Sequence, residues 1–292
     1  MAWEELVIET DADFAPQLAE LLDQAGASAV TFVDAQDDPI FEPPLDTTPL
    51  WARTVVKALF EQGAALRATL DRLQADHGEW IGQSRIERLP EQDWERAWMD
   101  DFQPLRFGRR LWIVPSWCEA PDPQAVNLDL DPGIAFGTGT HPTTALCLEW
   151  LDGHPPQGET VIDYGCGSGI LAIAAALLGA RHVVATDIDP QALEATRANA
   201  ERNGVASRVE VVAPEQLPVM QADRVLANIL AGPLAELAPR LIGLTRPGGT
   251  LVLAGLLDEQ AETVAAAYHN HCRMAVGDRR EGWSRLEGER IQ

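Results

Sequence analysis

The chain has 292 residues, a length that is sufficient for one large or two modest domains. Its hydrophobic content of 46% is ordinary for a globular protein. Its formal net charge of −23 argues against electrostatic binding to nucleic acid and favours a basic partner. The sequence has no run of 18 apolar residues and no secretory signal pattern, so we expect a cytoplasmic protein without a membrane span.

The cysteines bear on redox state and metal binding, and the acidic residues bear on the kind of partner. The four cysteines are scattered and form no C-x-x-C pair, which favours reduced thiols, and we expect no metal site. Residues 1–50 contain twelve Asp or Glu and no Lys or Arg. A recognition surface for a basic partner or a generally acidic surface would each explain this excess.

Residues 1–90 predict a small α+β domain. Strand patterns occur at 3–8, 29–33, 53–60 and 84–89, and helical patterns run from Phe14 to about Gly26 and over 64–75. The order βαββαβ is typical of a ferredoxin-like sandwich. The proline-rich segment 37–49 is a predicted loop. No cluster of titratable groups suggests chemistry here, so we expect a substrate-recognition domain.

Residues 91–104 are expected to form a helical linker. Within it, 91–101 has a helical pattern in which Trp94 and Trp98 share one face. Core packing between domains is a better interpretation of this pair than a ligand cage. A strand pattern at 107–115 then leads into the second domain.

The second domain, residues 105–292, is predicted to be α/β because strand and helix patterns alternate along it. Strands are expected near 160–164, 182–187, 208–212, 222–227, 249–254, 272–276 and 283–287. Helices are expected near 143–151, 169–178, 190–202, 232–243 and 258–268. Because no helix separates the last two strands, they should form an antiparallel hairpin.

The most informative motif is the stretch V-I-D-Y-G-C-G-S-G at 161–169, where a buried strand runs into Gly165, Gly167 and Gly169. Glycines permit a tight turn and let a ligand approach the backbone. Asp187 follows the next strand, 22 residues after Gly165, where a ribose hydroxyl pair would be held. The spacing is G-x-G-x-G rather than the dinucleotide fingerprint G-x-G-x-x-G, and it resembles the first motif of S-adenosylmethionine methyltransferases.

Four neighbouring residues have more ordinary interpretations. Asp189 precedes a proline and is best read as a helix N-cap. Asp163 braces the glycine turn or approaches the amino group of the cofactor. Cys166 fills a tight corner and is not expected to be a nucleophile. Glu215 could reach an adenine, but Pro214-Glu-Gln is equally a helix start.

Two further segments should border the same crevice. The fourth strand of the second domain ends in Asn228, whose amide offers a carbonyl oxygen and an N–H donor to an amine. A strand-end asparagine can also merely cap a turn. The glycine-rich loop 130–144 could fold over a cofactor as a lid. His141, which precedes a proline at its end, is better read as a cap than as a base.

Three sequence blocks now carry a resemblance to a known family: D-P-G-I-A-F-G-T-G-T-H-P-T-T at 131–144, the glycine motif with D-I-D-P-Q-A, and L-A-N-I-L-A-G-P-L at 226–234. Together they resemble the ribosomal protein L11 methyltransferase family, strongly over 128–292. The resemblance implies a Rossmann-like methyltransferase sheet with a closing antiparallel hairpin, preceded by the ferredoxin-like domain. It implies S-adenosyl-L-methionine as the cofactor.

Carried over by position, the resemblance places cofactor contacts on Thr144, Gly165, Asp187 and Asn228, and we add Gly167 from the glycine turn. Asn228 is the expected catalytic residue. The implied substrate is ribosomal protein L11, methylated on lysine side chains and its N-terminal amine by a monomeric enzyme that does not contact nucleic acid. The alternatives are a different basic protein or amine as substrate, a non-catalytic S-adenosylmethionine-binding module and, more remotely, a nicotinamide dehydrogenase.

Overall fold

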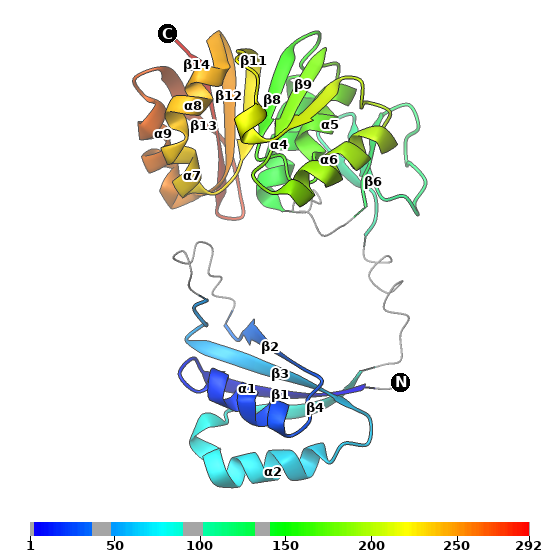
Figure 1. Cartoon of the computed structure of the whole chain (residues 1–292), viewed down its shortest axis with the longest axis vertical. Helices are drawn as coiled ribbons and strands as arrows, with labels where there is room; N and C mark the ends of the chain where they lie inside the picture. The colour runs from blue at the N-terminus through cyan, green and yellow to red at the C-terminus, as the bar shows by residue number, and fades with distance from the viewer. Residues whose placement is uncertain (1–2, 37–47, 90–101, 132–140, 292) are drawn as a thin grey trace. The chain divides into compact units, whose positions relative to one another are not determined.

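The structure, a computed structural model, describes residues 3–36, 48–89, 102–131 and 141–291 (Figure 1). Contacts divide the chain into two compact units, 1–97 and 98–292. The helix expected at 91–101 lies outside the described residues, as do most of the loop 37–49 and the centre of the loop 130–144. No helix in the described ranges is long and apolar enough to cross a membrane.

The N-terminal unit has the predicted order and a four-stranded antiparallel sheet in the order β2-β3-β1-β4. The ferredoxin-like arrangement is therefore confirmed. The structure extends the first strand to Asp11 and shifts the second helix by two residues. The elements are β1 (Trp3–Asp11), α1 (Ala15–Gln24), β2 (Ala29–Asp34), β3 (Arg53–Glu61), α2 (Leu66–His77), a 3-10 turn (Gly78–Trp80) and β4 (Ser84–Leu89).

One face of this sheet packs against both helices. Leu6 and Ile8 of β1 are fully buried on this face, and alternate residues of β3, such as Val56 and Ala58, are buried with them. They share a core with Leu18 and Leu22 of α1 and Leu70 of α2, which lie three or four residues from other apolar positions of their helices. The period of two in the strand and of nearly four in the helices thus produces one shared core.

The second unit is built on a seven-stranded sheet in the order β10-β9-β8-β11-β12-β14-β13. The first five strands in this order are parallel, and β14 is antiparallel to both of its neighbours, so the predicted closing hairpin is confirmed. The strands are β8 (Thr160–Tyr164), β9 (His182–Thr186), β10 (Val209–Val212), β11 (Ala222–Asn228), β12 (Thr245–Leu257), β13 (Cys272–Arg280) and β14 (Trp283–Arg290).

Helices cover both faces of this sheet (Figure 1). One buried cluster joins the sheet to α4 (Pro142–Gly153), α5 (Ile170–Leu177) and α6 (Pro190–Arg202). A second cluster joins its other face to α7 (Ala231–Glu236), α8 (Ala238–Leu244) and α9 (Ala261–Tyr268). Strand order reverses between β8 and β11, and ligands of such sheets bind at this point, beyond the carboxyl ends of the strands.

Several elements differ from the prediction in their bounds, and two differ in kind. The helix expected at 232–243 is split at Leu237, because the ring of Pro239 cannot continue the preceding helix without clashing with the carbonyl four residues earlier. The sequence also did not predict β7 (Val126–Asp129), which pairs with β6 (Leu111–Val114) beside β5 (Leu105–Phe107) in a small sheet. Only one of its four residues is buried, so its apolar pattern is too short to recognise.

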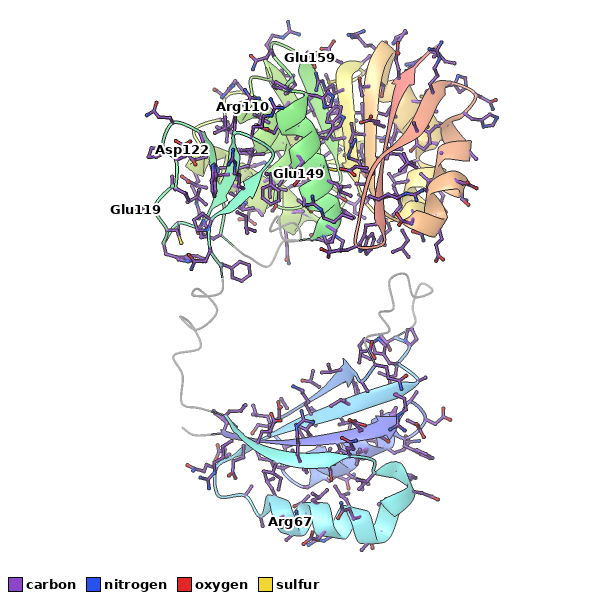
Figure 2. All side chains as sticks on the ribbon, turned by 180° about the vertical axis from the view of Figure 1, so that it is seen from behind. Arg67, Arg110, Glu119, Asp122, Glu149 and Glu159 are labelled. Carbon is purple, nitrogen blue, oxygen red and sulfur yellow. The ribbon has the colours of Figure 1, made fainter. Side chains whose placement is uncertain are left out.

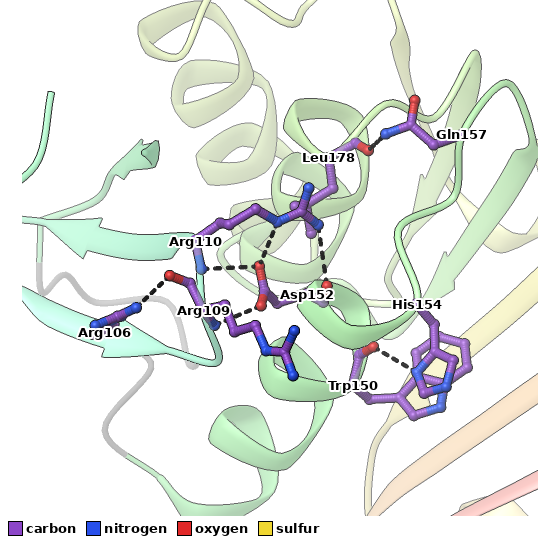
Figure 3. A network of polar contacts seen from close by, with 8 residues as sticks. All are labelled: Arg106, Arg109, Arg110, Trp150, Asp152, His154, Gln157 and Leu178. Carbon is purple, nitrogen blue, oxygen red and sulfur yellow. Dashed lines mark hydrogen bonds and ion pairs between the residues drawn. The ribbon is translucent and has the colours of Figure 1, made fainter. Parts of the chain in front are cut away.

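A buried carboxylate attaches this small sheet to α4 (Figure 3). Asp152 accepts from the N–H groups of Arg109 at 2.6 Å and Arg110 at 3.3 Å, and from Arg110 Nε at 3.4 Å. At Gly108, where φ is +66°, a Cβ atom would lie 2.5 Å from Asp152 Oδ2. The lack of a side chain at Gly108 therefore allows the β5–β6 turn to sit directly on the helix.

Candidate active site

The glycine turn after β8 has the geometry that its sequence predicts. Gly165, Gly167 and Gly169 all have positive φ, at +82°, +53° and +80°. The N–H groups of Gly165 and Cys166 donate to the carbonyl of Thr186 at the end of β9, at 2.8 and 3.0 Å. A Cβ atom on Gly165 would lie 2.3 Å from Ile229 Cγ2. The turn is therefore held against β9 and against the residue that follows β11.

Asp187 supports this turn from the end of β9. Its Oδ2 accepts from the N–H of Gly167 at 2.9 Å, and its Oδ1 accepts from the N–H of Asp189 at 3.0 Å. Asp187 remains half-buried, and a carboxylate has about four acceptor positions, so both oxygens can accept further hydrogen bonds. Asp189 caps α6 by accepting from the N–H of Gln191 at 2.9 Å, as expected. The two aspartates thus have separate roles.

Asp163 is buried beneath the turn, with 1% of its surface exposed. Its Oδ2 accepts from the N–H of Ala172 in the first turn of α5 at 2.9 Å, so one of its expected roles, bracing the turn, fits this contact. Its Oδ1 has no hydrogen-bond partner among the described residues. Burial raises the pKa of Asp163 to about 7, the Ala172 hydrogen bond opposes the rise, and the Asp187 carboxylate adds to it.

Cys166 fills a corner of the turn, as expected. Its Sγ lies 3.3 Å from Oγ1 of Thr196 on α6, and that hydroxyl donates to the carbonyl of Gly167 at 3.0 Å. Burial raises the pKa of the Cys166 thiol far above its ordinary value. Since the thiolate is the nucleophilic form, this cysteine is inert at neutral pH.

The place between β8 and β11 where the strand order reverses is the switch point of the sheet. On its β11 side, Asn228 contacts the first turn of α4. Asn228 Nδ2 donates to Oγ1 of the buried Thr144 at 3.2 Å. Asn228 Oδ1 is buried and has no partner among the described residues. Buried amide oxygens are normally hydrogen-bonded, so an oxygen left free at a strand end marks a place for an external donor. The N–H side of this amide is fixed, and its acceptor side is available.

His141 caps α4, in agreement with the predicted cap role. Its Nδ1 accepts from the N–H of Thr143 at 3.3 Å at the start of α4. Its ring packs edge-on against Trp283 of the hairpin, with 4.7 Å between centroids. Burial lowers the pKa of His141, and the Glu281 carboxylate acts in the opposite direction. Glu215 lies in a short 3-10 helix, Pro214–Gln216, which agrees with the helix-start interpretation.

The carbonyl of Ile229 was expected from the sequence to help position the amine, but the packing of this residue against two glycines was not predicted. Ile229 separates Asn228 from α7, and its side chain contacts the space in front of Gly165. Its carbonyl faces Gly255 of β12, where φ is +88° and a Cβ atom would lie 2.3 Å from that oxygen. The one available signal was an isolated glycine within a strand pattern, which often marks a close backbone approach.

The residues at this crevice fit S-adenosylmethionine. Asn228 Oδ1 and Asp163 Oδ1 have no partner among the described residues, and the carboxylate of Asp187 can accept beyond the two N–H groups that it already binds. Such oxygens suit hydroxyl groups and a cationic amino group rather than a phosphate. At Gly167, where φ is +53°, no side chain keeps a ligand from the backbone of the turn. The orphaned oxygens of Asp163 and Asn228 belong to neighbouring strands, β8 and β11, so the two acceptors flank the switch point.

Comparisons with known proteins agree with this geometry. The family model described as "Ribosomal protein L11 methyltransferase (PrmA)" matches residues 2–291. A protein of the same name from Pseudomonas aeruginosa (strain LESB58) is 58% identical over 291 residues, which is 99% of both chains. Another, from Azotobacter vinelandii, is 56% identical and covers 99% of this chain and 100% of its own.

Among solved structures, the ribosomal protein L11 methylase from Lactobacillus delbrueckii subsp. bulgaricus is similar, with a TM-score of 0.60 and 31% identity. The match covers 65% of this chain and 100% of that one. Fold, site residues and relatives together define an S-adenosylmethionine-dependent methyltransferase. Within that class, the chain belongs to the ribosomal protein L11 methyltransferase family.

Proposed function

We propose that this enzyme transfers methyl groups from S-adenosylmethionine to amino groups of ribosomal protein L11, namely lysine side chains and the N-terminal amine. The family membership supports the substrate, since the close relatives carry that name. The observation that carries the chemistry is the buried, unpartnered Oδ1 of Asn228 at the switch point. An acceptor in this place suits the N–H of an incoming amine.

Methyl transfer to an amine requires the neutral form, because only that form has a lone pair. A lysine with a pKa near 10.4 is mostly charged at pH 7, and deprotonating it costs roughly 4–5 kcal/mol. An α-amine with a pKa near 8 costs about 1 kcal/mol. A desolvated crevice lowers this cost, since burial disfavours the ammonium form. S-adenosylmethionine supplies the electrophilic methyl group on a sulfonium.

The chain's own contribution is positioning. Thr144 holds Nδ2 of Asn228, so the amide presents Oδ1 to the target amine. The carbonyl of Ile229 lies close against Gly255, which the lack of a side chain there permits, and this carbonyl would provide a second acceptor. Two acceptors on the N–H groups would direct the lone pair toward the methyl group. Such positioning supplies most of the acceleration in this account, and the proton is lost to water.

We assign the cofactor to Thr144, Gly165, Gly167, Asp187 and Asn228, with Asn228 also acting on the amine. Asp187 would bind the ribose hydroxyls, which is supported by its half-buried carboxylate beside the glycine turn. Asp163 Oδ1 lies beneath the turn without a partner among the described residues, and it would accept when Asp163 is ionised and donate when it is protonated.

We assign residues 1–90 to substrate recognition, 91–104 to a linker and 105–292 to catalysis. The assigned site residues all lie in the second unit. In the first unit, the acids of β1 are partly neutralised, by Arg53 beside Asp11 at 3.0 Å and Lys57 beside Glu5 at 3.5 Å. The net charge of −23 over the chain still favours a basic partner over nucleic acid, and we propose a cytoplasmic monomer.

The test is to incubate the full chain with radiolabelled S-adenosylmethionine and a ribosomal protein fraction, and to identify the labelled band. Label in ribosomal protein L11 supports the proposal. Label only in another basic protein would assign a different substrate. Binding of S-adenosylmethionine without labelling of any protein would indicate a non-catalytic binding module.

A further inference from the structure

A hollow of about 190 Å³ lies beside the N-terminus of α4 in the second unit. Its apolar wall comes from Leu105 and Phe107 of β5 and from Pro142 and Ala145 of α4, which lie on either side of Thr144 in the sequence. Its rim carries Arg106, Arg280 and Glu281. The mechanism proposed above uses none of these residues.

The hollow lies at the same edge of the sheet as Asn228. Asn228 pairs with Ala254 near the carboxyl end of β12, and Leu257 of β12 pairs with Trp283 at the start of β14. The turn between β13 and β14, which contains Glu281, therefore projects from the carboxyl edge. The edge-on contact between His141 and Trp283 also joins this turn to the start of α4. The hollow is thus on the Asn228 side of the switch point, away from β9 and Asp187.

Its size and lining suit one long side chain. Pockets for whole small-molecule ligands are commonly 300–1,000 Å³, so this hollow is too small for a nucleoside. Leu105 is 36% exposed at its wall, whereas Phe107 and Ala145 are 5% exposed. An apolar wall open to solvent at one end is what the methylene stem of a lysine or arginine packs against while its charged group stays in water.

The charge at the rim is uneven. Arg280 is paired with Glu149 of α4, with Nη2 to carboxylate distances of 3.1 and 2.8 Å (Figure 2 labels Glu149). Arg106 donates to the carbonyl of Arg109 and lies 5.9 Å from the ring centroid of Trp112. Glu281 is exposed, and no ion pair joins it to another described residue. Arg106 keeps its positive charge at the β5 side of the rim, because neither contact neutralises it. At the β13–β14 side, the ion pair with Glu149 balances Arg280, which leaves the carboxylate of Glu281, whose charge acts on the His141 ring.

Glu281 also has an unusual backbone. It is the one described non-glycine residue with positive φ, at +52°, and Gly282 follows at +80°. A two-residue hairpin turn with both φ values positive favours Asn-Gly or Asp-Gly, so glutamate is an unfavourable choice there. A residue kept in a disfavoured conformation suggests a use for its side chain.

We propose that this hollow is an acceptor subsite that binds a lysine or arginine side chain neighbouring the methylated amine in the protein substrate. The methylene stem packs on Leu105, Phe107 and Pro142, and the cationic group pairs with Glu281. The inference rests on the proposed function for the identity of the substrate. It adds a contact close to the reacting amine, separate from any recognition by the first unit.

The test uses the full chain, purified ribosomal protein L11 and saturating S-adenosylmethionine. Glu281→Gln should raise KM for L11 about two- to fivefold, as expected for an exposed charge pair, with kcat nearly unchanged. Glu281→Lys should raise KM further. Leu105→Ser should raise KM by removing part of the apolar wall. Glu262→Gln, which removes an exposed acid from α9 on the other side of the sheet, is the matched control and should leave KM unchanged.

Glu281→Asn separates charge from backbone conformation, because asparagine favours this turn and carries no charge. It should raise KM as much as Glu281→Gln does while keeping or raising the melting temperature. A normal KM for Glu281→Asn would assign any effect of Glu281→Gln to the turn, and equal KM values for Glu281→Gln and Glu262→Gln would likewise overturn the subsite.

Calorimetric binding of L11 distinguishes failure of the subsite from failure of the proposed function. If the wild-type chain binds L11 without methylating it, the proposed function fails, and a raised Kd for Glu281→Gln still supports the subsite. If the wild-type chain neither binds nor methylates L11, both proposals are wrong.

Discussion

Asn228 and Thr144 are 84 positions apart, and the amide of Asn228 donates to the hydroxyl of Thr144 at 3.2 Å. This contact joins the end of β11 to the first turn of α4 and fixes which side of the amide is available. It leaves Asn228 Oδ1 buried without a partner among the described residues. In our account that oxygen receives the N–H of the target amine.

Replacement of Asn228 tests this role. We expect Asn228→Ala to lower kcat about 100-fold and to change the affinity for S-adenosylmethionine much less, since a positioned acceptor acts mainly in the transition state. Thr144→Val should lower kcat by a smaller factor, because it frees the amide to rotate while keeping its oxygen. Steady-state rates and calorimetric titration provide the two readouts. Normal turnover by Asn228→Ala would exclude amine positioning by this side chain.

The ribose assignment can be tested by comparing two neighbouring aspartates. Asp187→Ala should weaken S-adenosylmethionine binding strongly, because a charge-assisted hydrogen bond contributes about 1.5–3 kcal/mol. It should also lower stability, since the Gly167 and Asp189 N–H groups lose their acceptor. Asp189→Ala should cost about 1 kcal/mol of stability through loss of the α6 cap and leave cofactor affinity intact. If only Asp189→Ala loses affinity, the ribose role belongs to Asp189.

Gly165 and Gly158 have similar positive φ values. Substitutions at the two positions therefore distinguish the cost of backbone strain from the cost of steric crowding. Gly165 has φ of +82° and Gly158 has φ of +71°, but a Cβ atom would clash with Ile229 only at Gly165. Gly158→Ala should cost about 1 kcal/mol of stability, as expected for positive φ alone. Gly165→Ala should cost clearly more and weaken cofactor binding. Chemical denaturation measures the difference, and equal costs at both positions would contradict the close approach of Ile229.

The raised pKa of Asp163 leads us to expect that the free energy of unfolding falls as the pH rises toward neutrality. Its pKa in the folded chain is raised to about 7, above the unfolded value near 3.9, so the folded state retains the proton over this interval. Its contribution to stability is therefore fully present below pH 4 and is lost as pH rises through 7. Asp163→Asn, which cannot ionise, should lack this contribution to the pH dependence. The stability of the wild type relative to Asp163→Asn should fall by up to about 4 kcal/mol between pH 4 and pH 8, and a constant difference would contradict the raised pKa.

Removal of the first unit tests the division of roles. A chain starting near residue 101 should keep S-adenosylmethionine binding and lose most methylation of L11. Methylation by the full chain should weaken as salt rises, because exposed charges are screened over about 8–10 Å at 0.1–0.15 M ionic strength. Undiminished methylation by the shortened chain would show that the first unit is not the recognition domain.

Local patterns predicted much of this architecture. The glycine turn was predictable because its spacing and the following apolar helix are properties of one short segment, and the Asp189 cap lies next to the proline that indicates it. Asn228 and Thr144 could each be named, but their contact depends on how α4 packs on the sheet. The protonation of Asp163 likewise depends on burial by α5. Strand β7 has only one buried residue, so its sequence contains no apolar pattern from which a strand could be predicted.

The most direct test of the central claim is the intact mass of purified ribosomal protein L11 after incubation with S-adenosylmethionine and either the wild-type chain or Asn228→Ala. The wild type should add mass in steps of one methyl group, and peptide digests should place the added methyl groups on amino groups. The variant should bind the cofactor and add almost none in the same time. An unchanged mass with the folded, cofactor-binding wild type, or equal methylation by Asn228→Ala, would contradict the account.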